Sequence, residues 1–211
     1  MPRDARHPDR CFNYAERTGR WLSLLQPPVS LANDGRNATL KSLGECPTAP
    51  DRDTDMTPAV KACEEAGISH EVIEYTHDSK TDSYGEEAAR VLDQPPSQVF
   101  KTLVTKLDGR QLAVAIVPVA AQLDLKAMAT SQKAKKAVMA GHGEAQRATG
   151  YVLGGISPLG QKRRLPTTID GTALGFEHIF VSGGKRGLEL RLDPRDLAKL
   201  CGASFAAIGK P

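Results

Sequence analysis

Residues 154–166 read GGISPLGQKRRLP and form the most informative stretch of this chain. The adjacent glycines Gly154 and Gly155 let the backbone approach a ligand closely and leave its N–H groups unscreened by a side chain. Pro158 fixes the backbone just after this bend, so the loop is shaped in advance. The basic run at 162–164 places positive charge beside the glycines. This combination favours a ligand with a carbonyl or oxyanion at one end and phosphates at the other.

Two further segments accompany this loop, VFKTLV at 99–104 and FVSGGKRGL at 180–188. Taken alone, the glycine loop is more typical of an ordinary Gly/Pro turn with a solvated basic edge, because such turns are common. The order and separation of the three segments along one chain carry more information than any of them singly.

In this order and spacing, the three segments closely resemble the YbaK/EbsC family of trans-acting aminoacyl-tRNA deacylases. The same fold appears as the editing insertion of bacterial prolyl-tRNA synthetase. The resemblance begins at Met56 and runs nearly to the C-terminus, and its best-matched stretch is TGYVLGGISP at 149–158. The branch that this chain resembles most is that of the Cys-tRNA(Pro) deacylases.

The composition agrees with a compact cytosolic protein. With 211 residues and 40% apolar content, the chain can bury one sizeable core. Its four cysteines form no C-x-x-C pair and have no histidine at zinc spacing, which predicts reduced thiols and no metal site. The apolar runs are too short for a membrane span, and no signal peptide is recognisable. We therefore expect a cytoplasmic protein that needs no cofactor, metal or membrane.

The formal net charge of +3 lies entirely in residues 56–211, because residues 1–55 carry 8 Lys/Arg and 8 Asp/Glu and leave 20 and 17 for the rest. Such a small excess does not by itself predict nucleic-acid binding. Basic clusters around the glycine loop favour an RNA-backbone contact, although each cluster alone is more typical of a solvated surface. The candidates for this contact are Lys162, Arg163, Arg164, Lys185 and Arg186.

The organisation of the chain changes near Met56. Residues 1–55 show no sustained hydrophobic period, and only 14–25 could form a short helix. We interpret 1–55 as a mostly disordered leader, with a misassigned start before Met56 as the alternative. In either case we expect 1–55 to contribute nothing to catalysis, and 56–211 to form the YbaK-like deacylase domain.

From Thr57 onward, capping residues and periodicity predict regular elements. We expect helices at 57–66, 86–92, 124–129 and 143–149, and a last one between Asp193 and Gly202. We expect strands at 71–75, 100–107, 111–119, 179–182 and 188–192, with a hairpin turn at Asp108-Gly109. Because strands and helices intermingle without a regular βαβ rhythm, the prediction is an α+β fold. Its sheet should be mixed, largely antiparallel and curled into a barrel-like core, and the resemblance implies a fold of the same kind.

Lys101 lies in a predicted strand, between Phe100 and Thr102, in an otherwise apolar segment. Such a lysine either points to solvent, which is the commoner case, or reaches into a cleft. A cleft lysine could be a nucleophile with a lowered pKa or a fixed cation that binds an oxygen. In the family, the lysine of this F/Y-K-T segment is functionally essential. The resemblance implies that Lys101 positions the terminal adenosine and the ester rather than attacking covalently.

The resemblance also assigns other residues to the pocket, each by its own match to the family. Tyr75 matches a family tyrosine, Tyr84 stands where relatives have an aromatic residue, and Thr102 and Ser182 match pocket hydroxyls. Glu189 departs from the pattern because close relatives have aspartate there, which leaves its contact to the substrate amino group open. Apart from the resemblance, Tyr75, Thr102, Ser182 and Glu189 are typical of ordinary strand positions. The loop match adds Gly154, Gly155, Ile156, Ser157 and Pro158.

Several familiar catalytic patterns are missing from the sequence. It contains no P-loop, no G-x-S-x-G elbow and no H-E-x-x-H motif. Four scattered histidines, His70, His77, His142 and His178, have no obvious nucleophile partner, and we expect surface or hydrogen-bonded roles for them. The resemblance implies instead that the substrate brings its own nucleophile: the sulfur of a cysteinyl ester attacks its own carbonyl. The protein would orient the ester and stabilise the oxyanion with the Gly154–Gly155 backbone.

The sequence therefore predicts a trans-editing deacylase for mischarged Cys-tRNA(Pro), with Cys-tRNA(Cys) as a further substrate. Its partners would be the acceptor end of tRNA and, as a second suggestion, prolyl-tRNA synthetase. One alternative is a deacylase for another small amino acid, such as alanine, that uses water as nucleophile. The other is a non-catalytic module that binds RNA or a synthetase.

Overall fold

The computed structural model describes residues 56–77 and 83–210, which lie within one compact unit of the chain. The predicted leader 1–55 and the short helix expected at 14–25 lie outside the described residues. The helices are α1 Pro58–Glu65, α2 Tyr84–Val91, α3 Leu125–Ser131, α4 His142–Thr149 and α5 Pro194–Cys201, with the 3-10 helix η1 Gly171–Gly175. The strands are β1 His70–Glu74, β2 Val99–Leu107, β3 Gln111–Pro118, β4 Gln122–Leu123, β5 Ala137–Met139, β6 Thr167–Asp170, β7 Ile179–Ser182, β8 Leu188–Leu192, β9 Ser204–Ala206 and β10 Gly209–Lys210.

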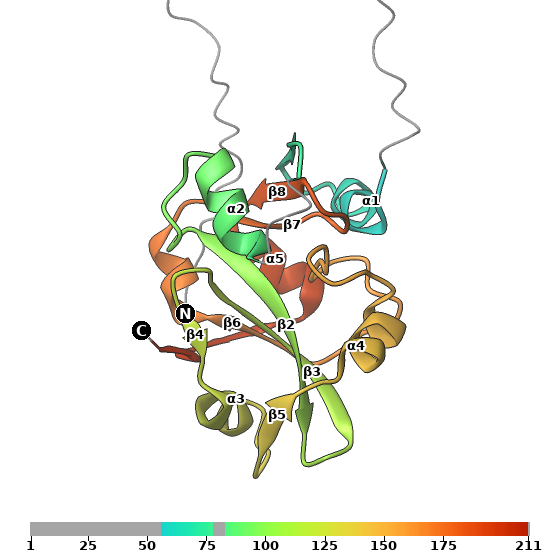
Figure 1. Ribbon diagram of the computed structural model, residues 1–211, viewed down its shortest axis with the longest axis vertical. Coiled ribbons are helices and arrows are strands. Elements are labelled where there is room, and N and C mark those ends of the chain that lie inside the picture. Colours follow the sequence, from blue (N-terminus) through green and yellow to red (C-terminus); the bar gives the residue numbers. More distant parts are fainter. Residues whose placement is uncertain (1–55, 78–82, 211) are drawn as a thin grey trace, which may run out of the picture. The chain divides into compact units, whose positions relative to one another are not determined.

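The main sheet is mixed, with the strand order β1-β8-β7-β2-β3-β6-β9 and β5 paired to β2 (Figure 1). The pairs β1–β8, β7–β8, β2–β3 and β2–β5 are antiparallel, whereas β2–β7, β3–β6 and β6–β9 are parallel. The predicted α+β fold with a mixed, largely antiparallel sheet is therefore confirmed. A separate two-stranded ribbon joins β10 to β4.

Capping residues set the helix ends where the sequence predicted them. Thr57 Oγ1 accepts a hydrogen bond from the Val60 N–H at 3.3 Å, and Pro58 follows at the first helical position of α1. The Asp193 carboxylate caps α5, and Gly202 ends it in the left-handed conformation with φ 63°. Every predicted helix and strand is present, and its observed ends differ from the predicted ones by at most two residues.

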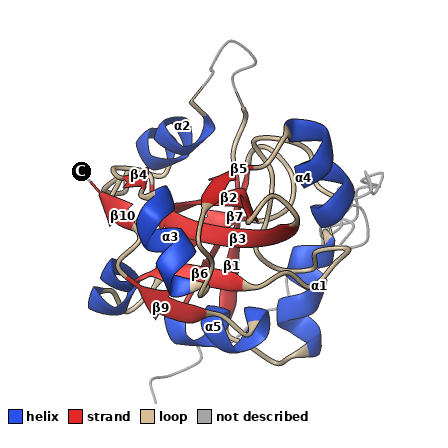
Figure 2. Cartoon of the chain, turned by 90° about the horizontal axis from the view of Figure 1, so that it is seen from below, coloured by secondary structure: helices blue, strands red, loops and turns tan. Residues whose placement is uncertain are grey.

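The two faces of the sheet pack against different helices (Figure 2). On one face, Val114 and Ile116 of β3 share a core with buried residues of α1, α4 and α5. On the other face, Ala113 and Ala115 pack with Met128 of α3. Helix α2 covers the beginning of β2 and the middle of β7 through a smaller apolar cluster. No helix among the described residues is both long and apolar enough to cross a bilayer.

The parallel pair β2–β7 is very short. The two strands are in register only at Val99↔Phe180 and Phe100↔Val181. Beyond this point β2 continues with β3, while β7 continues with β8. The side chains that follow, Thr102 on β2 and Ser182 on β7, are thus left beside a gap between the two strands.

Candidate active site

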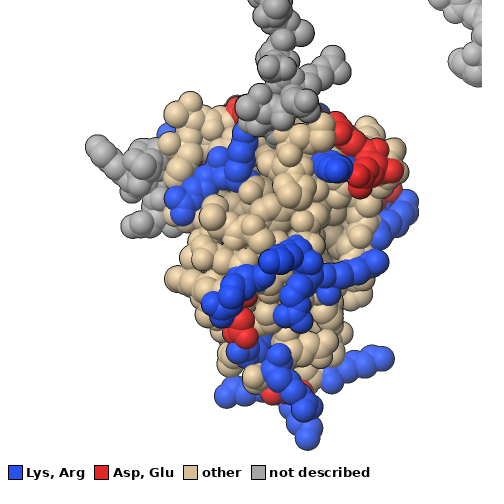
Figure 3. Space-filling model, turned by 90° about the vertical axis from the view of Figure 1, so that its right-hand side faces the viewer, with Lys and Arg blue, Asp and Glu red and all other residues tan. Residues whose placement is uncertain are grey.

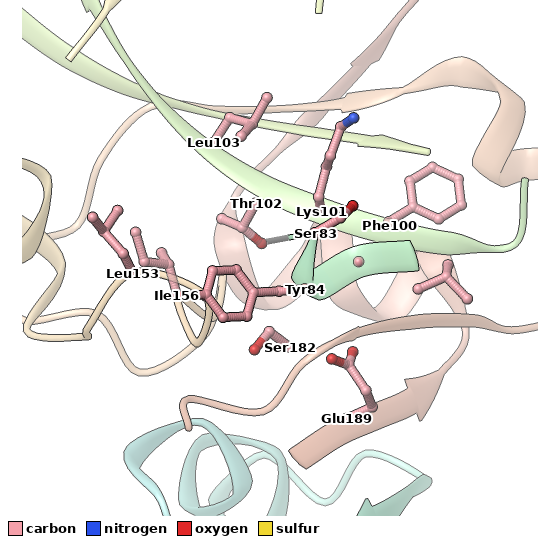
Figure 4. Close-up of a pocket in the computed structure, with 13 residues that line it drawn as sticks. Ser83, Tyr84, Phe100, Lys101, Thr102, Leu103, Leu153, Ile156, Ser182 and Glu189 are labelled. Carbon is pink, nitrogen blue, oxygen red and sulfur yellow. The ribbon is translucent and has the colours of Figure 1, made fainter. Parts of the chain in front are cut away.

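A cavity of about 280 Å³ lies where β2 separates from β7 (Figure 4). Its walls come from the start of α2, from β2, from the loop before Ile156 and from the β7–β8 pair. The lining residues are Ser83, Tyr84, Gly85, Val99, Phe100, Lys101, Thr102, Leu103, Leu153, Gly154, Ile156, Ser182 and Glu189.

Most of the predicted site residues meet in this cavity. Those that line it are Lys101, Gly154, Tyr84, Thr102, Ile156, Ser182 and Glu189. Gly155, Tyr75, Ser157 and Pro158 do not. The Ser157 hydroxyl oxygen accepts a hydrogen bond from the Leu159 N–H at 3.2 Å, so it shapes the loop. The Pro158 carbonyl similarly accepts a hydrogen bond from the Cys201 thiol, at 3.4 Å.

The glycine loop needs both of its glycines, for different reasons. Gly154 has φ 82°, and a Cβ at this position would lie 2.8 Å from the Tyr84 ring. At Gly155 a Cβ would lie 2.9 Å from the Lys185 carbonyl carbon. The Gly155 N–H donates to the Val152 carbonyl at 3.1 Å. Among the described residues no acceptor takes the N–H of Gly154, so this group rather than Gly155 can serve an oxyanion.

Neighbouring segments hold this loop in place. The Tyr151 hydroxyl donates to the Leu159 carbonyl at 2.8 Å and closes the loop on itself. Thr57, the cap of α1, donates its hydroxyl to the Gly183 carbonyl and so anchors the β7–β8 turn. Gly160 packs tightly on the Pro58 carbonyl, where a Cβ would clash at 2.3 Å. Helix α1 therefore supports both the loop and the turn.

Two buried hydroxyls face the cavity without partners. Among the described residues nothing forms a hydrogen bond with Thr102 Oγ1 or Ser182 Oγ. Leaving a buried hydroxyl unsatisfied costs about 1–3 kcal/mol. Both hydroxyls line the cavity, and a polar ligand bound there would satisfy them. These orphaned groups are the strongest sign that the cavity binds a ligand.

Glu189 lies opposite Ser182 in the β7–β8 register, and its residue exposure is only 7%. Burial raises the pKa of the Glu189 carboxyl to about 8, which favours its protonated form at neutral pH. Tyr75 lies close to Glu189. Burial raises the pKa of the Tyr75 phenol, and the negative charges of Glu189 and Glu87 raise it further. A substrate ammonium placed next to Glu189 would favour the ionised carboxylate.

Lys101 enters the cavity from a different side. Its half-buried ammonium donates to the Val119 carbonyl at 3.3 Å. Burial lowers the pKa of Lys101, and the Glu86 charge partly opposes this effect. Figure 4 shows the Lys101 side chain pointing away from the Thr102 hydroxyl, as successive residues of a strand do. The cation therefore faces another part of a bound ligand than Thr102, Ser182 and Glu189 do.

The rim around Tyr84 contains Arg186, a predicted RNA contact, and His77, which the sequence did not reveal as a site residue. The Arg186 guanidinium lies 4.7 Å above the centroid of the Tyr84 ring, and its Nε donates to the Leu153 carbonyl at 3.0 Å. His77 lies 5.3 Å from Tyr84 between ring centroids, and its Nδ1 is 2.6 Å from the buried Glu87 carboxylate. His77 is thus hydrogen-bonded, as expected, but its partner ten residues away follows from no sequence pattern.

The basic clusters predicted to contact RNA divide between two places. Arg186 lies at the cavity rim, and Lys185 forms an ion pair with Glu74 at 3.0 Å. Arg163 and Arg164 line a separate hollow near α4, and Lys162 is exposed next to them in the chain. The structure therefore does not bring the two clusters into one cavity.

The raised pKa of Glu189 gives a testable pH dependence of stability. Between the ordinary glutamate pKa and about 8, the folded protein binds more protons than the unfolded chain. Stability should therefore fall as the pH rises through this range and stay level above it. Glu189→Gln removes this penalty. Because each tenfold change in proton affinity corresponds to about 1.4 kcal/mol, the gain from Glu189→Gln should grow by at least about 2 kcal/mol between pH 5 and pH 9.

Urea unfolding of the wild type and of Glu189→Gln at pH 5, 7 and 9 measures this difference. Glu177→Gln, at an exposed position, is the matched control and should show no such growth. An equal gain from Glu189→Gln at pH 5 and pH 9 would contradict the assignment of a raised pKa.

Comparison with known proteins places this site in a family. The family model of the aminoacyl-tRNA editing domain matches residues 78–200. The chain belongs to this family. Editing domains remove amino acids from mischarged tRNA, so the protein is an aminoacyl-tRNA deacylase, as the sequence predicted. The matched range includes all of the cavity lining.

Individual relatives agree with this membership. A protein of Enterococcus faecalis named "Putative Cys-tRNA(Pro)/Cys-tRNA(Cys) deacylase EbsC" is 33% identical over 152 residues, which cover 72% of this chain and 92% of that protein. The crystal structure of "a putative trans-editing enzyme for prolyl tRNA synthetase" is 25% identical, with a TM-score of 0.64, and the match covers 74% of this editing-domain chain and 100% of the other. A second structure, of the hypothetical protein APE2540, has a TM-score of 0.66 at 21% identity over 73% of this chain and 100% of the other, and supports the fold alone.

Proposed function

We propose that this editing-domain protein is a trans-acting deacylase of Cys-tRNA(Pro), with Cys-tRNA(Cys) as a second substrate. Membership in the editing family and the name of the Enterococcus relative support this substrate class. The physical need for such an enzyme is plain. A synthetase pocket built for proline discriminates against a similarly small side chain by only about 1–3 kcal/mol. A second site must therefore hydrolyse the mischarged product.

The observation that carries the proposal is the chemistry of the cavity lining. Among the described residues it contains no nucleophile that is hydrogen-bonded to a base, because the Thr102 and Ser182 hydroxyls have no partners and the Ser83 hydroxyl makes no cap bond or contact with a base. Cys63 and Cys201 do not line it, and burial raises their thiol pKa values to about 11 and about 12. His77 is held by Glu87 outside the lining. A substrate with its own nucleophile fits such a site.

A cysteinyl ester supplies that nucleophile. Its sulfur attacks the ester carbonyl, the bond to the ribose oxygen breaks, and the thiol proton ends on that oxygen. The direct product is a four-membered thiolactone, which water opens to cysteine. A thiol with a pKa of about 8.5 is a few per cent ionised at neutral pH and reacts readily.

The cavity offers a place for each part of such an ester. The amino group of the cysteinyl moiety would lie against Glu189, with the orphaned hydroxyls of Thr102 and Ser182 as further polar contacts. The Gly154 N–H would face the oxyanion. Lys101, which points to the other side, would bind the terminal nucleotide, and the Tyr84 ring offers a surface for stacking. The enzyme thus contributes orientation and charge rather than covalent chemistry.

A panel of charged tRNAs tests this proposal. We expect fast single-turnover deacylation of Cys-tRNA(Pro) and slower release, by about 100-fold or more, from Ala-tRNA(Pro) and Pro-tRNA(Pro). Cys-tRNA(Cys) should react at a rate similar to that of Cys-tRNA(Pro). Faster hydrolysis of Ala-tRNA(Pro) would assign the protein to the water-dependent deacylases instead. Adding prolyl-tRNA synthetase to the Cys-tRNA(Pro) reaction tests whether that enzyme acts as a partner.

A further inference from the structure

A second hollow, of about 440 Å³, is dominated by arginines. We call it the arginine hollow and define it by Arg110, Arg147, Arg163 and Arg164, with Glu144 as the acidic residue of its lining. These residues come from the β2–β3 hairpin, from α4 and from the segment before β6. Figure 3 shows Lys and Arg side chains gathered in a band on the molecular face that carries α4.

Within the described part of the chain, no carboxylate neutralises the arginines of this hollow. Among the described residues, no carboxylate lies within ion-pair distance of the four guanidinium groups, and none of these groups donates a hydrogen bond. Glu144 is engaged elsewhere, because its carboxylate lies 2.7 Å from the Lys106 ammonium. Each guanidinium carries five N–H donors and no acceptor. Arg110, Arg147 and Arg163 therefore offer unpaired donors around one hollow, whereas the Arg164 guanidinium lies against Gly202 at the end of α5.

The chemistry of these groups favours phosphate. The planar fork of arginine matches the oxygens of a phosphate, and the four residues are exposed enough to reach a large ligand. The hollow is wider than a single phosphate needs, and arginines from three separate segments line it. An extended phosphodiester backbone therefore fits better than an isolated anion.

The arginine hollow is linked to the catalytic cavity by shared elements. The segment from Leu153 to Pro166 contributes Leu153, Gly154 and Ile156 to the cavity, and its last four residues to the hollow. Strand β2 runs from Lys101 in the cavity to Leu107, beside the hairpin that carries Arg110. With a rise of about 3.3 Å per residue, this path spans about 20 Å. Phosphates of one strand follow each other at about 3.4 Å along a helix axis, so about 20 Å corresponds to several nucleotides.

We propose that the arginine hollow binds phosphates of the substrate RNA several nucleotides from the aminoacylated end that occupies the cavity. This inference rests on the proposed function, since it needs an RNA whose end enters the cavity. It assigns Arg110 and Arg147, which no sequence pattern marked, to the same surface as Arg163 and Arg164. In this arrangement Arg186 lies at the rim of the cavity, and the arginine hollow contacts the RNA farther from its aminoacylated end.

Binding of uncharged tRNA(Pro) to the full chain tests the site directly by fluorescence anisotropy. The paired substitution Arg147→Ala with Arg163→Ala should raise the dissociation constant at least about tenfold at 0.1 M salt. It should also make the salt dependence shallower by about 2 in slope. The matched control, Lys126→Ala with Arg195→Ala, removes the same charge from exposed positions outside the hollow and should change affinity less than threefold. Arg147→Lys with Arg163→Lys, which keeps the charge, should recover most of the affinity.

A second test compares the deacylation kinetics of a full-length tRNA with those of a short RNA that cannot reach the hollow. For the Arg147→Ala, Arg163→Ala pair, the ratio of kcat/KM on Cys-tRNA(Pro) to kcat/KM on a cysteinylated CCA trinucleotide should fall at least about tenfold. Equal losses in the control pair, or an unchanged tRNA affinity in the folded alanine pair, would overturn the proposal. If the alanine pair does not fold, Arg163→Gln alone is measured against Arg195→Gln. A wild type that binds tRNA through the hollow but deacylates neither substrate would instead refute the proposed function.

Discussion

Replacing Lys101 by alanine should lower kcat/KM for Cys-tRNA(Pro) by about 100-fold or more while leaving the fold intact. Lys101 is a cation in the cavity lining, and among the described residues its ammonium hydrogen-bonds to the Val119 carbonyl alone. Losing this contact costs little stability, because Val119 is only partly buried and the bond is a single long one. Losing a fixed charge inside a partly desolvated site removes an interaction that water does not replace. Single-turnover deacylation and thermal unfolding, measured on the same preparation, separate the two effects.

A second substitution at Lys101 tests whether the site needs a compact ammonium or accepts any positive charge. Lys101→Arg should also lose most activity, because a planar guanidinium cannot occupy the place of a compact ammonium in a confined site. Lys126→Ala is the matched control, because Lys126 is an exposed lysine of α3 that lines neither the cavity nor the arginine hollow. At saturating substrate it should keep activity within about threefold. Near-normal deacylation by folded Lys101→Ala would remove Lys101 from the site.

The long elements of this fold could be predicted because their signals are local. Thr57 with Pro58, and Asp193 with Pro194, begin helices whose ends glycines define. The Asp108-Gly109 turn fixes the β2–β3 hairpin, which forms the centre of the sheet. Each of these signals acts within a few residues and needs no tertiary context.

The short strands β5, β6 and β9 could not be predicted, because each is held by a distant partner. Strand β6 is buried along its whole length, so its side chains show no alternation of apolar and polar residues. It lies between β3 and β9 in parallel pairs that join residues far apart in the chain. Pairing at such separation leaves no pattern in a window of a few residues.

The candidate site likewise has features that the sequence predicted and features that only the structure shows. Lys101, Thr102, Gly154, Ser182 and Glu189 were predicted from motif matches, and they do line one cavity. A motif match does not say in which direction a side chain points. Only the structure shows that the Lys101 ammonium points away from the Thr102 hydroxyl (Figure 4). The arginine hollow was only half predicted, since Arg110 and Arg147 are single basic residues in their own segments and meet Arg163 only in the fold.

The nucleophile gives the prediction with the largest expected effect. If the substrate sulfur attacks the ester, the rate should follow the chemistry of the substrate side chain. Ser-tRNA(Pro) has nearly the same size as Cys-tRNA(Pro), but its hydroxyl is far less ionised at neutral pH than a thiol with a pKa of about 8.5. We expect deacylation of the serine ester to be at least about 1,000-fold slower. Quenched single-turnover assays with both esters on the same tRNA measure this ratio.

A blocked sulfur separates the role of the thiol from its contribution to binding. S-Methylcysteinyl-tRNA(Pro) retains the sulfur and the amino group that would face Glu189, but it cannot form a thiolate. It should still compete with Cys-tRNA(Pro) for the enzyme and yet release no amino acid above the uncatalysed rate. Fast release from the methylated or the serine ester would mean that the enzyme activates water. Because the described lining holds no base poised on a nucleophile, that result would require Glu189 or Lys101 to take a proton from water. Glu189 could do so only once it is ionised, so kcat/KM for the water-dependent reaction should rise as the pH approaches about 8, while a bound substrate ammonium would move this rise in kcat to lower pH.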